Sequence, residues 1–152
     1  MTNLFSSLAE FVNLVKELPA ADQEAASGAV DRNAQLTKPA GSLGKLEDIA
    51  LWYAAWRGNT RPSIEAPQVV IFAGNHGVCA QGVSAFPSEV TQQMVYNFQA
   101  GGAAINQLSK CFGAKLDVIA LVLDTPTADF TAGLALSEAE LVAALQSGWD
   151  GV

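Results

Sequence analysis

Two apolar runs of strand length constrain the fold of this chain most. The first, "QVVIFAG", begins at Gln68, and the second, "KLDVIALVLD", begins at Lys115. Both are rich in β-branched residues and lack polar alternation, which is typical of strands covered on both faces. Helix-like patterns separate the two runs, so the strands must pair in parallel through a right-handed crossover. The sequence predicts an α/β fold with a parallel Rossmann-like sheet and crossover helices.

The predicted sheet is incomplete, because two strands are too few for a stable sheet and a further strand is expected after "GWDGV". We expect an N-terminal helical segment over residues 1–62 and the first part of an α/β domain over residues 63–152. Asp22 and Ser42 are predicted N-caps in the helical segment. Ser137 and Glu140 have the spacing of a capping box at the start of the last helix.

Composition excludes several classes of function. Half of the 152 residues are hydrophobic, and the net charge of -7 disfavours binding to nucleic acid or to an anionic membrane surface. The N-terminus lacks a basic leader, and no apolar run reaches the roughly 20 residues of a membrane span. The two cysteines show neither disulfide nor metal-ligand spacing. We therefore expect a cytoplasmic protein without a metal ion or other cofactor.

The loop "AGNHGV" follows the first predicted strand and is the first candidate site. Ligands of parallel α/β sheets bind outside the carboxyl ends of the strands. Asn75 and His76 offer polar groups there, between Gly74 and Gly77. The alternative is that both side chains satisfy backbone groups at the turn. Cysteine catalysis by Cys79 with His76 is disfavoured, because no third group that would orient the imidazole is evident.

Four large apolar side chains, Phe86, Met94, Tyr96 and Phe98, surround the next predicted helix. Such a stripe is usually core, but Phe86 and Met94 also suit a flat slot for an aromatic ring. Two glycine-containing segments, Gly101-Gly102 and "KPAGSLGK", are candidate phosphate contacts. Tight helix packing is favoured for the glycine pair, and solvated charges are equally compatible with the lysines.

Four segments together resemble the motif set of the nicotinate-nucleotide:dimethylbenzimidazole phosphoribosyltransferase family (the CobT family). They are "LTKPAGSLGKLE", "FAGNHGV", "GVSAFPSEVTQQMVYNFQAGGAAIN" and "LDTPTADF", and they occur in the family's order. The resemblance covers nearly all of the chain from about Gln35 onward and corresponds to the amino-terminal portion of the family. It implies transfer of ribose 5-phosphate from nicotinate mononucleotide to 5,6-dimethylbenzimidazole, giving α-ribazole 5'-phosphate in cobalamin synthesis.

The resemblance also implies roles for individual residues. Phe86 and Met94 fall where family members line the benzimidazole pocket, and His76 matches a loop that shapes or contacts the site. Asn75 stands where many relatives have aspartate. The family's general-base glutamate lies beyond residue 152, so the resemblance assigns no catalytic residue to these 152.

The resemblance further implies small-molecule substrates and a homodimer of the complete enzyme. This chain alone is expected to be inactive. The alternative function is a non-catalytic, truncated or split binding or interaction module that carries part of an aromatic-base pocket.

Overall fold

The computed structural model describes residues 4–152, so the first three residues of the predicted N-terminal segment lie outside the described residues. Contacts divide the chain into two compact units, which are treated separately below. One unit comprises residues 16–65, and the other combines the segment ending at residue 15 with residues 66–152. Compact units are not necessarily domains that fold independently, and the division at residue 62 stays a prediction.

The unit of residues 16–65 is a helical pair, α2 (Gln23–Ala34) and α3 (Lys45–Arg57). Its buried residues are all alanines, which lets the two helices approach closely: Ala25, Ala29, Ala54 and Ala55. The Asp22 carboxylate accepts from the Ala25 N–H at 2.9 Å, as predicted for the N-cap of α2. Val30, on the same helix, is exposed although it is a large apolar residue.

The predicted start of α3 at Ser42 is wrong. The helix begins at Lys45, and its N-cap is Gly44, whose φ of 54° lies in the left-handed region that favours glycine. The Ser42 N–H donates to the Pro39 carbonyl, so this serine belongs to the preceding turn. The local serine signal failed because Glu47 reaches back to the Leu43 N–H and supplies the acceptor at this helix end.

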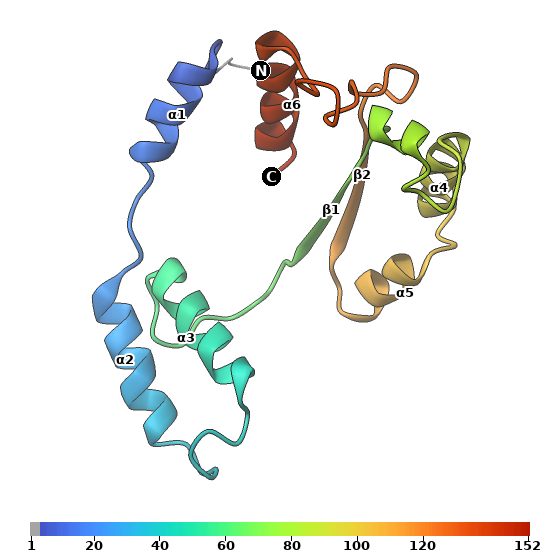
Figure 1. The fold of residues 1–152 in the computed structure, drawn as a ribbon. Helices are drawn as coiled ribbons and strands as arrows, with labels where there is room; N and C mark the ends of the chain where they lie inside the picture. The colour runs from blue at the N-terminus through green and yellow to red at the C-terminus, as the bar shows by residue number, and fades with distance from the viewer. Residues whose placement is uncertain (1–3) are drawn as a thin grey trace. The chain divides into compact units, whose positions relative to one another are not determined.

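The other unit contains a two-stranded parallel sheet, as predicted (Figure 1). Strand β1 (Gln68–Ala73) pairs with β2 (Lys115–Ala120), and the register runs from Gln68 opposite Lys115 to Ala73 opposite Ala120. The α/β class and the incomplete sheet are therefore confirmed. The remaining elements of this unit are α1 (Leu8–Lys16), the short 3₁₀ helix η1 (Gly77–Gln81), α4 (Glu89–Gln99), α5 (Ala104–Cys111) and α6 (Glu138–Asp150).

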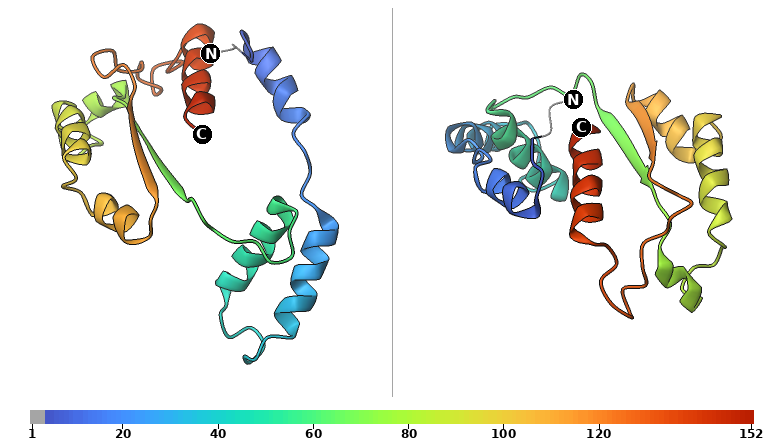
Figure 2. Two further views of the ribbon diagram at one scale, coloured as in Figure 1. Left: turned by 180° about the vertical axis from the view of Figure 1, so that it is seen from behind. Right: turned by 90° about the horizontal axis from the view of Figure 1, so that it is seen from above.

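Helices α4 and α5 lie on one face of the sheet and α6 lies on the other, as Figures 1 and 2 show. On the α6 face, a Cβ added to Gly151 would meet the Ile119 Cδ1 at 2.8 Å and the Phe72 Cζ at 3.1 Å. The end of α6 therefore packs directly against both strands. We expected strands buried on both faces, but no residue of β1 or β2 is fully buried. Among the described residues, each strand has only one neighbouring strand, and few helices pack on the sheet.

The core of this unit is small. Its buried apolar side chains are Phe5, Val95 and Val142, contributed by the N-terminal segment, α4 and α6. The Phe5 ring meets Phe11 edge-on at 4.9 Å between centroids and Trp149 at 6.3 Å. The N-terminal segment is thereby held against α6.

The starts of α4 and α6 have residue types that are favoured at helix starts. Helix α4 begins at Glu89, directly after Pro87 and Ser88. Ser137 and Glu140 form the predicted capping box of α6, with the Ser137 N–H donating to Glu140 at 2.7 Å. None of the helices described in residues 4–152 is long and apolar enough to cross a membrane.

Candidate functional site

The carboxyl end of β1 leads into a hollow of about 330 Å³, called the ring hollow below. Its walls come from β1, from the loop and η1 that follow it, from the segment before α4, and from α4 itself. The four residues predicted to bind substrate, Asn75, His76, Phe86 and Met94, all line it. The structure thus brings together side chains that are up to 19 positions apart in the chain (94 − 75).

Phe86 and Met94 belong to the apolar lining of the ring hollow and are not core residues. Phe86 is 68% exposed and Met94 is 38% exposed. Ser84 fixes the backbone at Phe86, because its hydroxyl donates to the Phe86 carbonyl at 2.8 Å and accepts from the Phe86 N–H at 3.3 Å. An exposed aromatic ring on a locally fixed backbone is suited to contact a flat apolar ligand.

Asn75 satisfies other groups of the chain with both ends of its side-chain amide. Its Nδ2 donates to the Leu123 carbonyl at 2.9 Å, and its Oδ1 accepts from the Thr91 hydroxyl at 2.7 Å. Leu123 follows β2 and Thr91 lies on α4, so the amide joins three segments. The contacts agree with the alternative in which this side chain satisfies a backbone group at the turn.

His76 and Gly77 lie where the backbone after β1 runs alongside residues 127–129. The Gly77 N–H donates to the Thr127 carbonyl at 2.9 Å, and the Thr127 N–H donates to the Asn75 carbonyl at 3.2 Å. His76 and Thr127 thereby form a parallel bridge beyond the named strands. Gly77 has no room for a side chain, since an added Cβ would lie 2.5 Å from the Thr127 carbonyl oxygen. His76 is exposed, and it lines both the ring hollow and a second one.

Two further hollows meet at Asn75. A mostly apolar one of about 500 Å³ lies between the end of β2 and α6, and Glu140 lines it. The N–H and the hydroxyl of Ser137 both donate to the Glu140 carboxylate, and these hydrogen bonds lower the pKa of Glu140. A polar one of about 470 Å³ is lined by Glu89 and Asp124, beside the start of α4. No Asp or Glu of residues 4–152 lines the ring hollow.

Sequence reasoning did not name Thr91, and it named Phe98 only as one of four apolar side chains around the helix; both residues line the ring hollow. Thr91 and Phe98 share the face of α4 that carries Met94, three and four positions away from it, and this helical spacing is the signal that could have found Thr91. Tyr96, which we grouped with these side chains, is 61% exposed and lies outside the ring hollow. Cys79 also lines the hollow, together with His76.

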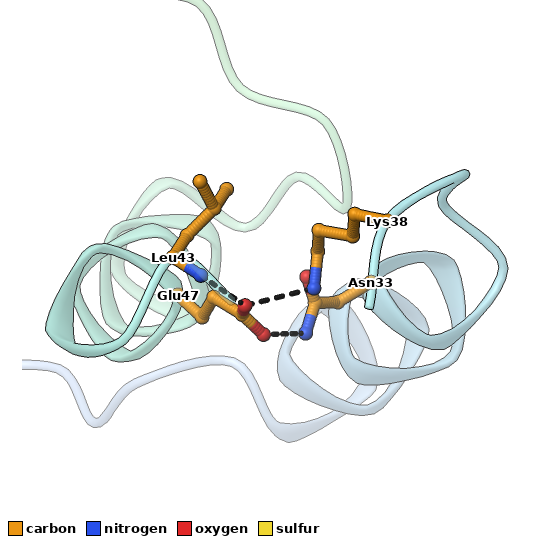
Figure 3. A network of polar contacts seen from close by, with 4 residues as sticks. All are labelled: Asn33, Lys38, Leu43 and Glu47. Atoms are coloured by element: carbon orange, nitrogen blue, oxygen red, sulfur yellow. Dashed lines mark hydrogen bonds and ion pairs between the residues drawn. The ribbon is translucent and has the colours of Figure 1, made fainter. Parts of the chain in front are cut away.

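The candidate phosphate contacts have structural partners. In the unit of residues 16–65, Figure 3 shows Lys38 paired with Glu47, with 2.8 Å between Nζ and Oε1. Glu47 also accepts from the Asn33 side chain at 2.7 Å and from the Leu43 N–H at 3.1 Å. The Asn33 amide and the Lys38 ammonium lower the pKa of Glu47 to about 2. The charge of Lys38 is thereby engaged within the chain.

The Gly101-Gly102 pair forms a tight connection between α4 and α5. Gly101 has a φ of 80°, and an added Cβ on Gly102 would collide with the Asn97 side chain. The first amide of the α5 turn, from Ala103, donates to the Asn106 side chain at 3.1 Å. These contacts support the packing interpretation of the glycine pair. Within residues 4–152, no three His, Cys, Asp or Glu side chains are grouped to hold a metal ion.

A ring hollow at the carboxyl end of a parallel sheet is the arrangement of an α/β enzyme that acts on small molecules. The family model described as phosphoribosyltransferase matches residues 18–152, and the chain belongs to this family. The nicotinate-nucleotide–dimethylbenzimidazole phosphoribosyltransferases of Roseobacter denitrificans and Ruegeria pomeroyi are each 60% identical to it over 152 residues. These alignments cover 100% of this chain and 45% of each relative, so the chain spans about half the length of the curated relatives it matches.

Solved structures show the same relationship. The crystal structure of CobT from Thermus thermophilus is 40% identical, with a TM-score of 0.68, and the match covers 81% of this chain and 42% of that one. A structure of nicotinate-nucleotide-dimethylbenzimidazole phosphoribosyltransferase from the same organism gives a TM-score of 0.69 at 40% identity, with 82% and 43% covered. The resemblance inferred from the four sequence motifs is confirmed.

Proposed function

We propose that this chain supplies the base-binding side of a phosphoribosyltransferase site. The reaction transfers ribose 5-phosphate from nicotinate mononucleotide to 5,6-dimethylbenzimidazole, and the products are nicotinate and α-ribazole 5'-phosphate. The observation that carries the proposal is the ring hollow, in which exposed Phe86 and Met94 converge with Asn75 and His76 at the end of β1. Relatives that are 60% identical bear the name of this activity.

The ring hollow has the size and chemistry for a flat aromatic base. Its volume of about 330 Å³ lies at the small end of the usual range for ligand pockets, roughly 300–1,000 Å³. A phenylalanine ring stacked on a benzimidazole contributes about 0.5–1.5 kcal/mol beyond the area it buries. The Met94 thioether adapts to methyl substituents and contacts aromatic rings favourably. Phe86 and Met94 would therefore bind the base, with His76 at the edge of the hollow.

The transfer also needs a proton acceptor. One nitrogen of the benzimidazole attacks the anomeric carbon, the bond from that carbon to nicotinate breaks, and the proton on the other nitrogen passes to a general base. Among the described residues no carboxylate lines the ring hollow, and Glu140 lies in a different one. We propose that the base comes from outside residues 4–152, and we expect no turnover by the 152-residue chain alone.

The test uses a chimera in which these 152 residues replace the matching 45% of the Roseobacter denitrificans relative. Formation of α-ribazole 5'-phosphate is followed by chromatography. We expect turnover by the chimera, and a KM for 5,6-dimethylbenzimidazole raised about tenfold by Phe86→Ala, the loss of one stacking contact. Tyr96→Ala is the matched control, because Tyr96 is an equally exposed aromatic outside the hollow. An inactive chimera, or equal effects of the two substitutions, would contradict the proposal.

A non-catalytic binding module is the second candidate. Two observations favour it: the described residues form the ring hollow by themselves, and no described carboxylate lines it. Calorimetry of the 152-residue chain with 5,6-dimethylbenzimidazole distinguishes the two candidates. Binding by the chain together with an inactive chimera would support the module, whereas turnover by the chimera would rule it out.

We also propose that the protein works in the cytoplasm on small-molecule substrates and that the complete enzyme is a homodimer. The two free cysteines, which lack disulfide spacing, support a reducing compartment. The net charge of -7 argues against a nucleic-acid partner. Light scattering of the chimera at micromolar concentration tests the dimer, and a monomeric mass would contradict it.

A further inference from the structure

We propose that Asn75 and Thr91 are positioning residues, which hold α4 and the segment after β2 in the arrangement that shapes the ring hollow. The inference rests on the proposed function, because it concerns the binding of the same aromatic base. The sequence suggested that Asn75 contacts the substrate. In this proposal Asn75 instead joins the segments that carry the contact residues, and we call its hydrogen bonds to Thr91 and Leu123 the junction.

The contacts of the Asn75 amide join parts of the chain that are far apart in sequence. Thr91 lies 16 positions from Asn75, and Leu123 lies 48 positions from it. The hydroxyl of Thr91 donates to Oδ1 at 2.7 Å, and Nδ2 donates to the Leu123 carbonyl at 2.9 Å. Met94 is three positions beyond Thr91 on the same helix face. A shift of α4 relative to β1 would therefore move Met94 relative to Phe72 and the rest of the ring hollow.

The position of Asn75 among the hollows supports the same role. Asn75 lines the ring hollow, the polar hollow beside α4 and the apolar hollow beside α6. It is half-buried, and its backbone carbonyl accepts from the Thr127 N–H. Three hydrogen bonds, two from the side chain and one from the backbone carbonyl, fix the orientation of Asn75. The same bonds fix the relative positions of the segments that line the three hollows.

The junction uses both ends of the Asn75 amide. A carbonyl oxygen such as that of Leu123 accepts from a donor, and the Thr91 hydroxyl donates to an acceptor. Asparagine supplies both the donor and the acceptor in one plane. With these two bonds made, the amide retains one N–H and limited acceptor capacity for a ligand.

Substitutions of Thr91 separate positioning from direct contact with the base, since Thr91 also lines the ring hollow. Thr91→Val keeps the branched shape and removes the hydroxyl. Thr91→Ser keeps the hydroxyl and removes the methyl group that a ring would touch. If Thr91 acts through Asn75, valine is the harmful replacement and serine restores function. If Thr91 acts by packing on the ring, the order is reversed.

The experiment measures kcat and the KM for each substrate in the chimera, using 5,6-dimethylbenzimidazole and nicotinate mononucleotide. Loss of the hydrogen bond between Thr91 and Asn75 predicts that Thr91→Val and Asn75→Ala each raise the KM for the base about tenfold or more. Thr91→Ser is expected to stay within about twofold of the unsubstituted chimera. The KM for nicotinate mononucleotide should remain unchanged in all three. Asn13→Ala, at an exposed site on α1, is the matched control for the change of side chain in Asn75→Ala.

The KM for the base does not depend on the fraction of folded enzyme, so a purely structural role would lower the amount of active protein and leave this KM unchanged. An unchanged KM in Thr91→Val, or a tenfold rise in Thr91→Ser, would overturn the inference while the unsubstituted chimera remains active. An unsubstituted chimera that transfers no ribose phosphate would instead overturn the proposed function. The two failures are thereby distinguishable.

Discussion

Replacing Gly77 with alanine tests the backbone contact that shapes the loop after β1. The added Cβ would lie 2.5 Å from the Thr127 carbonyl oxygen, 2.8 Å from the Asp129 nitrogen and 2.9 Å from the Ala128 carbonyl carbon. All three are backbone atoms, so no change of rotamer relieves the collision. The two segments must separate.

Separation removes two hydrogen bonds, from the Gly77 N–H to Thr127 and from the Thr127 N–H to Asn75. Each contributes a net of about 0.5–1.5 kcal/mol, so Gly77→Ala is expected to lower the free energy of unfolding by about 1–3 kcal/mol. For a chain of this size, that corresponds to a fall in the melting temperature of about 2–12 °C. The base should also bind more weakly, because Asn75 and His76 move with the loop.

Urea denaturation followed by circular dichroism measures the change in stability of the 152-residue chain. Gly133→Ala is the matched control, because an added Cβ there meets no atom within 4 Å and φ is not positive. We expect this control to lie within about 0.5 kcal/mol of the unsubstituted chain. Equal stability of the Gly77→Ala and unsubstituted chains, or an equal loss in the control, would refute the argument from close approach.

Two further predictions concern the packing of each unit. The folded pKa of Glu47 is about 2 against an ordinary 4.5, so the stability that this carboxylate contributes is fully present above pH 4.5 and is lost as the pH falls toward 2. Glu47→Gln should remove that part of the dependence of the melting temperature on acid pH. An unchanged pH profile of the melting temperature would contradict the contacts of Glu47 with Asn33 and Lys38. Phe5→Ala removes a ring that is only 2% exposed and should cost about 3–5 kcal/mol in denaturant unfolding, whereas Phe130→Ala, at an exposed ring, should cost far less. Similar losses in the two variants would show that Phe5 does not anchor the N-terminal segment.

Sequence patterns predicted the features that depend on neighbouring residues. The Asp22 cap and the Ser137–Glu140 box each need contacts within a few positions, and both are present. The two strands were predicted from their own apolar runs, although their pairing joins distant segments. The start of α3 was wrong because Glu47 competed with Ser42 for the helix end. Local signals identify possible partners, and the structure shows which partner the backbone geometry allows.

Features that join distant segments could not be predicted in the same way. Nothing near Asn75 in the sequence indicates Leu123, which lies 48 positions away, and nothing near Gly77 indicates Thr127. A glycine at position 77 permits close backbone approach, but its partner is visible only in the fold. For the candidate site, the sequence identified four residues that line the ring hollow, while the hydrogen bonds that orient Asn75 depend on the fold.

The parallel bridge between His76 and Thr127 has a consequence for how base preference could change. Residues 74–76 line the ring hollow and are held by backbone pairing, and Gly77, which follows them, admits no side chain. Phe86 and Met94 also line the hollow, and both residues are exposed. We therefore expect substitutions at 86 and 94 to change the size of the hollow with little loss of stability, whereas a side chain at 77 would disrupt the backbone pairing. If the hollow binds the base as proposed, selection for a new base specificity should recover changes at 86 and 94 and none at 77.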